Sequence, residues 1–203
     1  GVEVNQQTEI GILLALPGLV ATMALSPWVI HIFYTPEFAA AATVLAWMVL
    51  GVFGRVISWP LGYVMLALGA ARWYAATEAI FVCLQAAAMF WLVRQYGVIG
   101  AAYAFALSYF AYVVAMLWTS RVLIGFRWAA SVHRLLLVAT VLVVASMLCS
   151  LLLPAPSQQL AGGLLACAAS ALSIRGLALR LGSEHRLVRW LHRIPGHQWI
   201  IPR

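Results

Sequence analysis

The chain has 203 residues, of which 65% are hydrophobic and only 8% are charged. A typical soluble domain is about 45–50% apolar and about 25% charged. So few charges cannot cover a water-facing surface, and the composition therefore predicts a membrane protein. It excludes a soluble enzyme, a disordered chain and a disulfide scaffold. The apolar runs are continuous rather than alternating, which disfavours a transmembrane barrel.

The net charge of +7 comes from twelve Arg and five Glu residues, because the sequence contains neither Lys nor Asp. The Arg residues are scattered between apolar segments and form no basic stripe of the kind that binds nucleic acid. We interpret them as signals that set the orientation of the chain in the membrane.

Six apolar segments follow one another, and each is close to the roughly 20 residues that a membrane-spanning helix needs. Most connections are short, which favours antiparallel neighbours in a compact bundle. The predicted fold is therefore an all-α, polytopic membrane bundle. The longest connection is expected from Ser120 to Arg134. The predicted spans cover residues 11–33, 39–67, 74–93, 98–119, 135–153 and 160–179.

The distribution of Arg between the connections predicts the orientation. With the N-terminus inside, the inner connections and tail carry nine Arg residues and the outer connections only Arg94. Cytoplasmic loops carry the excess of basic residues. We therefore expect both ends of the chain in the cytoplasm. The inner Arg residues are Arg72, Arg121, Arg127, Arg134, Arg180, Arg186, Arg189, Arg193 and Arg203.

The Arg-rich tail at 183–203 contains a predicted short amphipathic helix from Ser183 to Ile194. Its apolar residues recur at i, i+3, i+4 and i+7, and its Arg residues lie off that stripe. Such a helix would lie on an anionic inner leaflet. The alternative is a frayed polar tail. The apolar stripe consists of Leu187, Trp190, Leu191 and Ile194.

Arg55 lies in the middle of the second predicted span. An Arg at the centre of a bilayer costs about 2.5 kcal/mol or more and usually faces a polar cavity. At the rise of an α-helix it lies about 18 Å from the cytoplasmic end near Ala67. Its charge partner could be Glu78, which enters from the same side, a carboxylate elsewhere in the protein, or an anionic substrate. The alternative is an Arg that snorkels to a thinned interface.

Proline and glycine residues near Arg55 predict an irregular helix. Pro60 removes one backbone hydrogen bond and clashes with the carbonyl of Val56, and Gly54 removes side-chain bulk beside the charge. Pro17 is a weaker candidate for a kink in the first span. A kinked helix with an embedded charge is typical of transporters, where such helices form gates and binding sites.

No combination of residues indicates an enzyme. No two of the five Glu residues are placed as a catalytic pair, and none is expected at mid-membrane. The five His residues form no metal-ligand spacing with acids or cysteines. We therefore expect neither catalytic activity nor a metal or cofactor. Small residues at four-residue spacing predict close helix packing in the fourth span (Gly100, Ala104, Ser108) and the sixth (Gly162, Ala166, Ser170).

Over residues 1–125 the order of motifs resembles the C-terminal part of Wzx-type O-antigen and polysaccharide flippases. These belong to the multidrug/oligosaccharidyl-lipid/polysaccharide exporter superfamily. The stretches that carry the resemblance are NQQTE before a span, LLALPGL, FY and PEF at the outer turn, GVFGRVISWPLGY, ALG with RW, TE, and YGVIGAAYA.

The resemblance implies one lobe of a two-lobed helical transporter in the bacterial inner membrane. Such proteins move an undecaprenyl-pyrophosphate-linked sugar unit between leaflets by alternating access, and Arg55 would contact the pyrophosphate. Family members have 12 or 14 spans, so we expect either a fragment that lacks its N-terminal lobe or a protein that pairs with a second copy. The chain divides into 1–125 (four flippase-like spans), 126–182 (two further spans) and the tail 183–203.

Three alternatives remain open. The chain could belong to another transporter of the superfamily, such as a lipid II flippase or a drug/cation antiporter, although an antiporter needs intramembrane carboxylates. It could be a membrane-embedded glycosyl- or acyltransferase or a polymerase, although its outer loops, with Glu37 and Arg94, offer little for a site. It could also be a structural membrane subunit, in which Leu would replace Arg55 without penalty.

Overall fold

A computed structural model describes residues 2–33, 38, 40–67, 69–154 and 157–181. Within these residues the chain forms seven α-helices and no strand, which confirms the all-α prediction. Six of the helices are long and apolar enough to cross a membrane. The helices are α1 (Val2–Ala24), α2 (Ser26–Phe33), α3 (Ala41–Ala67), α4 (Ala71–Tyr96), α5 (Val98–Ile124), α6 (Ala130–Leu152) and α7 (Ser157–Leu181).

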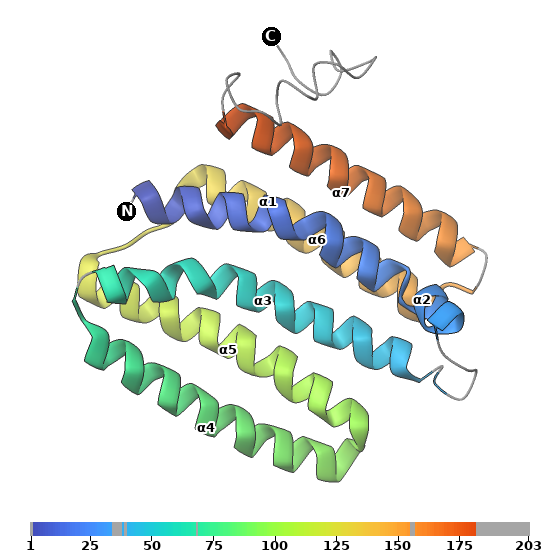
Figure 1. Ribbon diagram of the computed structural model, residues 1–203, viewed down its shortest axis with the longest axis horizontal. Helices are drawn as coiled ribbons and strands as arrows, with labels where there is room; N and C mark the ends of the chain where they lie inside the picture. The colour runs from blue at the N-terminus through green and yellow to red at the C-terminus, as the bar shows by residue number, and fades with distance from the viewer. Residues whose placement is uncertain (1, 34–37, 39, 68, 155–156, 182–203) are drawn as a thin grey trace.

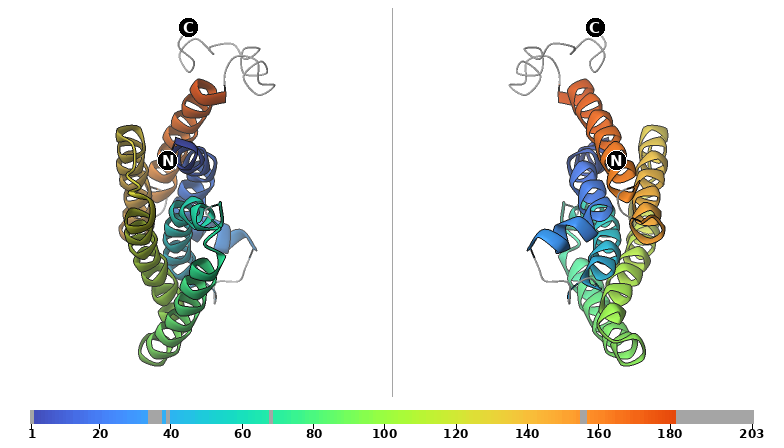
Figure 2. Two further views of the ribbon diagram at one scale, coloured as in Figure 1. Left: turned by 90° about the vertical axis from the view of Figure 1, so that its left-hand side faces the viewer. Right: turned by 90° about the vertical axis from the view of Figure 1, so that its right-hand side faces the viewer.

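The six long helices lie side by side in an elongated bundle (Figure 1). α7 forms one edge and packs on α1, and α1 also packs on α3 and α6. α3 packs mainly on α5, and α4 covers α5 at the opposite edge. The end-on views in Figure 2 show α7 and the α4–α5 pair at the two extremes of the molecule. α1 and α3 are therefore the central helices.

Two apolar clusters hold the bundle together. The larger one joins α1, α3 and α6 through buried residues such as Leu16, Phe53 and Val143. The smaller one includes Leu61 and Phe126 and lies where α3 meets α5. The outer faces also carry large apolar side chains, as expected for helices whose surroundings are hydrocarbon. Examples of these exposed residues are Trp73, Leu84, Leu107, Leu137 and Leu164.

α1 begins and ends earlier than the sequence pattern predicts. It starts at Val2 rather than near residue 11, because its polar residues have partners: Thr8 donates to the Val4 carbonyl at 2.8 Å, and Glu9 pairs with Arg180 at 2.7 Å. The predicted single span over 11–33 is wrong, since the helix breaks after Ala24. Pro27 lacks the N–H that would bond the Met23 carbonyl, and the Ser26 hydroxyl donates to it instead at 3.0 Å.

The connection between α5 and α6 is shorter than predicted. α5 continues to Ile124 and α6 begins at Ala130, so Arg121 and Arg134 belong to helices rather than to a loop. Gly125 ends α5 because it adopts a left-handed conformation (φ 61°) and its N–H bonds the Arg121 carbonyl at 2.9 Å. The Phe126 N–H bonds the Ser120 carbonyl, and the Phe126 ring is buried.

Gly162 confirms the predicted close packing of the last span. A Cβ atom at Gly162 would lie 2.8 Å from the Cβ of Ala24 in α1, closer than two carbon atoms can approach. The small residue therefore allows α7 and α1 to come into backbone contact. In the α4–α5 turn, a Cβ at Gly100 would lie 2.1 Å from the Leu92 carbonyl oxygen.

The described Arg residues that the sequence assigns to the inner side lie at one end of the bundle. The first residues of α1, α4 and α6 and the last residues of α3, α5 and α7 share this end (Figure 1), and Arg94 lies at the other. The last two spans, α6 and α7, pack directly on α1, the first helix of the flippase-like part. The predicted division of the chain at residue 125 stays a prediction. The tail 183–203, with its predicted amphipathic helix, lies outside the described residues.

Candidate functional site

Arg55 projects from the middle of α3 and is exposed. It lies 12 residues before the end of α3 at Ala67, and this separation corresponds to about 18 Å along the helix. Its guanidinium carbon lies 5.9 Å from the centre of the Tyr109 ring of α5, within the range of a cation–π contact. Among the described residues it forms no ion pair. Within the described residues, the direct contact recorded for this charge is therefore aromatic.

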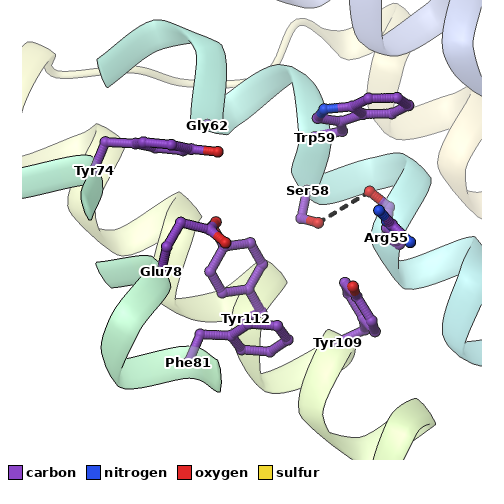
Figure 3. A pocket seen from close by; sticks show the side chains of 9 residues that line it. All are labelled: Arg55, Ser58, Trp59, Gly62, Tyr74, Glu78, Phe81, Tyr109 and Tyr112. Carbon is purple, nitrogen blue, oxygen red and sulfur yellow. Dashed lines mark hydrogen bonds between the residues drawn. The ribbon is translucent and has the colours of Figure 1, made fainter. Parts of the chain in front are cut away.

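Around Arg55, three helices form a small polar pocket with a volume of about 110 Å³ (Figure 3). Of the residues that α4 and α5 contribute to its walls, sequence analysis identified only Glu78 as a candidate site residue. α3 supplies Arg55, Ser58, Trp59 and Gly62, α4 supplies Tyr74, Glu78 and Phe81, and α5 supplies Tyr109 and Tyr112.

Glu78 shares this pocket with Arg55, but its hydrogen bond is made elsewhere. The Tyr112 hydroxyl donates to the Glu78 carboxylate across the α4–α5 interface. Figure 3 shows Glu78 beside Tyr112 and Arg55 on the other side of the pocket. The two charges line one cavity without an ion pair between them, so Glu78 as the direct charge partner of Arg55 stays a prediction.

Glycines of α3 give the pocket its aromatic wall. A Cβ atom at Gly54 would lie 3.2 Å from the Tyr109 Cβ, and one at Gly62 would lie 3.2 Å from the Tyr74 ring. Both glycines therefore let α4 and α5 approach α3 closely. A role of Gly54 in bending the helix stays a prediction, as α3 is helical on both sides of it.

Pro60 does not line this pocket but lines a neighbouring groove between α1 and α3. This groove has a volume of about 480 Å³ and is largely apolar. Trp59 belongs to both the pocket and the groove, and its ring stacks on Tyr63 with centroids 6.3 Å apart. α3 is helical on both sides of Pro60, and α1 is helical on both sides of Pro17. Gating at either proline stays a prediction.

Glu9 and Arg180 form an ion pair that sequence analysis did not detect. The Arg180 Nε donates to Glu9 Oε2 at 2.7 Å, and the two side chains are 28% and 10% exposed. The bond joins α1 to α7 at the Arg-rich end of the bundle. Arg180, which we interpreted as an orientation signal, thus also holds the last helix to the first.

The pocket around Arg55 carries groups that can bind a charged and polar compound. It offers one guanidinium group, several hydroxyl groups, aromatic faces and a single carboxylate. Arg recognises the oxygens of a phosphate group in a bidentate manner, and Tyr and Trp combine an apolar face with a polar edge. Comparison with protein-family models, with curated proteins and with solved structures finds no match to this chain.

Proposed function

We propose that the chain is part of a Wzx-type flippase that moves an undecaprenyl-pyrophosphate-linked oligosaccharide across the bacterial inner membrane. The observation that carries the proposal is Arg55, an exposed cation in the middle of a membrane-spanning helix, at the edge of a polar pocket. A charge at this depth is costly unless a partner compensates it. A pyrophosphate group would supply that compensation through charge-assisted hydrogen bonds.

The surroundings of Arg55 suit the rest of such a substrate. Tyr74, Tyr109 and Tyr112 present ring faces and hydroxyl groups to a sugar unit. The apolar groove that shares Trp59 with the pocket would accept the first part of a prenyl chain, since burial of apolar surface is favourable. A polar pocket beside an apolar groove thus matches a substrate with a charged head and an apolar tail.

A second lobe completes the proposed mechanism. The Arg55 pocket is open to the outside of this helical bundle, and a facing lobe would close it on one side of the membrane at a time. This lobe would come either from another part of the polypeptide or from a second copy. The Arg-rich end of the bundle, with both ends of the chain, would face the cytoplasm.

A cation-coupled antiporter is the second candidate, and Glu78 favours it. This carboxylate lies seven residues into α4, or about 10 Å from the start of the helix, and Tyr112 holds it in the pocket wall. An intramembrane carboxylate is the group that such an antiporter needs. The two candidates differ in which pocket residue recognises the transported compound.

Replacement of Arg55 in the full-length protein tests the proposal. We expect Arg55→Ala to lower surface polysaccharide at least about tenfold, because charge-assisted hydrogen bonds of about 1.5–3 kcal/mol are lost. Arg55→Lys should retain part of the activity, since it keeps the charge but not the bidentate geometry. Polysaccharide is measured on gels of surface extracts, and protein levels in the membrane by immunoblot.

Arg94→Ala is the matched control. Arg94 lies at the opposite end of the bundle, with its guanidinium carbon 4.4 Å from the centre of the Phe90 ring, and it does not line the pocket. This variant should leave surface polysaccharide unchanged. Normal polysaccharide in Arg55→Ala and Arg55→Leu cells, at normal protein level, would contradict the flippase proposal and favour a structural subunit. Normal polysaccharide in Arg55→Ala cells, together with loss of cation-coupled drug efflux in Glu78→Gln cells, would favour the antiporter.

A further inference from the structure

The connection between α5 and α6 forms a second pocket, separate from the one around Arg55. Its volume is about 410 Å³. It combines cationic or titratable groups with two aromatic rings and lies at the Arg-rich end of the bundle (Figure 1). The residues that line it are Arg121, Gly125, Phe126, Arg127, Trp128 and His133.

Local structure fixes the shape of this pocket. The Gly125 and Phe126 N–H groups bond the last carbonyls of α5, at 2.9 and 3.3 Å, and the buried Phe126 ring anchors the turn in the smaller apolar cluster. The Trp128 ring lies edge-on to the His133 ring, 5.9 Å between centroids. The connection is therefore held from both ends, and Arg127 projects from a rigid segment.

Within the described part of the chain, no carboxylate compensates the positive charge of the pocket. No Glu lines it, and neither Arg121 nor Arg127 forms an ion pair among the described residues. Both side chains are exposed. The neighbouring Arg134 differs, because its Nε lies 3.4 Å from the Ala130 carbonyl oxygen of its own helix. Two guanidinium groups and an imidazole thus converge on a space that suits an anion.

The position of the pocket points to the class of anion. It lies at the connection between two membrane-spanning helices, α5 and α6, at the level where Trp and Arg residues contact lipid headgroups. Basic pockets between spanning helices bind the headgroups of anionic lipids. We propose that Arg121 and Arg127 bind the phosphate group of an anionic lipid, with Phe126 and Trp128 forming the apolar side of the site.

If Arg121 and Arg127 served only to orient the chain in the membrane, they would not need to line a pocket. The positive-inside rule depends on the number of basic residues near the ends of the spans and requires no pocket between them. A built site makes a different prediction: binding should be saturable, should depend on these two Arg residues, and should not depend on others at the same end. Arg72 and Arg134 provide that comparison, since neither lines the pocket.

Native mass spectrometry of the purified full-length protein tests the site. We expect the protein to retain one phosphatidylglycerol molecule in preference to phosphatidylethanolamine. The double variant Arg121→Gln/Arg127→Gln should bind phosphatidylglycerol about thirtyfold more weakly, because each of the two basic residues near the membrane surface contributes to the attraction of an anionic lipid. Arg121→Lys/Arg127→Lys should retain most of the binding. Arg72→Gln/Arg134→Gln has the same change in charge and should bind as the unmodified protein does.

The source of the phosphate is resolved in the same experiment. Retention of farnesyl pyrophosphate in place of phosphatidylglycerol, lost in the same Gln variant, would support the phosphate site and assign it to a prenyl lipid. Equal retention by both Gln variants, no preference for phosphatidylglycerol or farnesyl pyrophosphate, or displacement of lipid by equimolar inorganic phosphate would overturn the proposal. Arg55→Ala should leave retention of phosphatidylglycerol unchanged, so that result is independent of the flippase proposal. Retention of farnesyl pyrophosphate is compared in the Arg55→Ala background, because the pocket around Arg55 is itself proposed to bind pyrophosphate.

Discussion

The Tyr112 hydroxyl group holds the carboxylate of Glu78 in the wall of the central pocket. The two residues come from adjacent helices, and Tyr112 is buried, whereas Glu78 is half-buried. In surroundings of low polarity, a carboxylate that loses its hydrogen-bond donor is left unpaired, and an unpaired buried polar group is energetically costly. The bond therefore contributes both to the α4–α5 interface and to the shape of the pocket.

Replacement of Tyr112 by Phe should lower the free energy of unfolding by about 1–3 kcal/mol, because the ring still packs on Phe81 but the Glu78 carboxylate loses its donor. Unfolding in mixed micelles measures this change. Tyr63→Phe is the control, since Tyr63 is 52% exposed. A loss as large in Tyr63→Phe, or an unchanged loss when Glu78 is already Ala and offers no acceptor, would contradict the role of this hydrogen bond.

Arg55 and Pro60 could be identified from the sequence because charge and proline are rare inside membrane spans. Their surroundings could not. Glu78 and Tyr112 are 34 positions apart, and Glu9 and Arg180 are 171 positions apart. No local spacing indicates which helices become neighbours, so the aromatic walls of the pocket and the α1–α7 ion pair emerge only from the packed bundle.

Adjacent glycines of α7 provide a test of helix packing. A Cβ at Gly162 would meet the Ala24 Cβ at 2.8 Å, whereas a Cβ at Gly163 would meet nothing within 4 Å. Gly162→Ala should therefore lower the free energy of unfolding by about 1–3 kcal/mol. Gly163→Ala should leave it unchanged or raise it by up to about 1 kcal/mol, since Ala favours the helix. Equal effects of the two substitutions would contradict the close approach of α7 to α1.

The sequence pattern predicts the existence of the helices better than it predicts where they begin and end. The six spans were predictable because each apolar run matches the thickness of a bilayer. The start of α1 was missed because its polar residues have distant partners: Asn5 accepts from the Ala129 N–H just before α6, and Glu9 pairs with Arg180 of α7. The end of α5 was missed because Gly125 was not recognised as a helix cap. A hydrophobicity pattern therefore does not predict helix boundaries that are set by tertiary contacts or by a single capping residue.

The bundle as a whole places its polar pocket between three helices at about mid-depth. α4 lies at the edge and has no buried residue among its 26 positions, so its outer face meets lipid or another part of the assembly. One end of the bundle carries the Arg-rich connections and the α5–α6 pocket. We propose that the Arg55 pocket is open to water inside the membrane and admits a pyrophosphate group.

Thiol accessibility at Tyr109 tests this claim most directly. Tyr109 lines the pocket beside Arg55, whereas Leu107, two residues away on α5, is exposed on the outer apolar surface. Each is replaced by Cys in the full-length protein, after Cys83, Cys149 and Cys167 have been changed to Ala. The rate of reaction with a water-soluble, membrane-impermeant thiol reagent is then measured with and without farnesyl pyrophosphate.

The account predicts that Tyr109→Cys reacts readily and Leu107→Cys does not, because the reagent attacks thiolates and a thiol facing hydrocarbon stays protonated and dry. Farnesyl pyrophosphate should slow the reaction at Tyr109→Cys when Arg55 is present and should have no effect in Arg55→Ala. An unreactive Tyr109→Cys, or protection that persists without Arg55, would contradict a water-filled pocket in which Arg55 binds pyrophosphate.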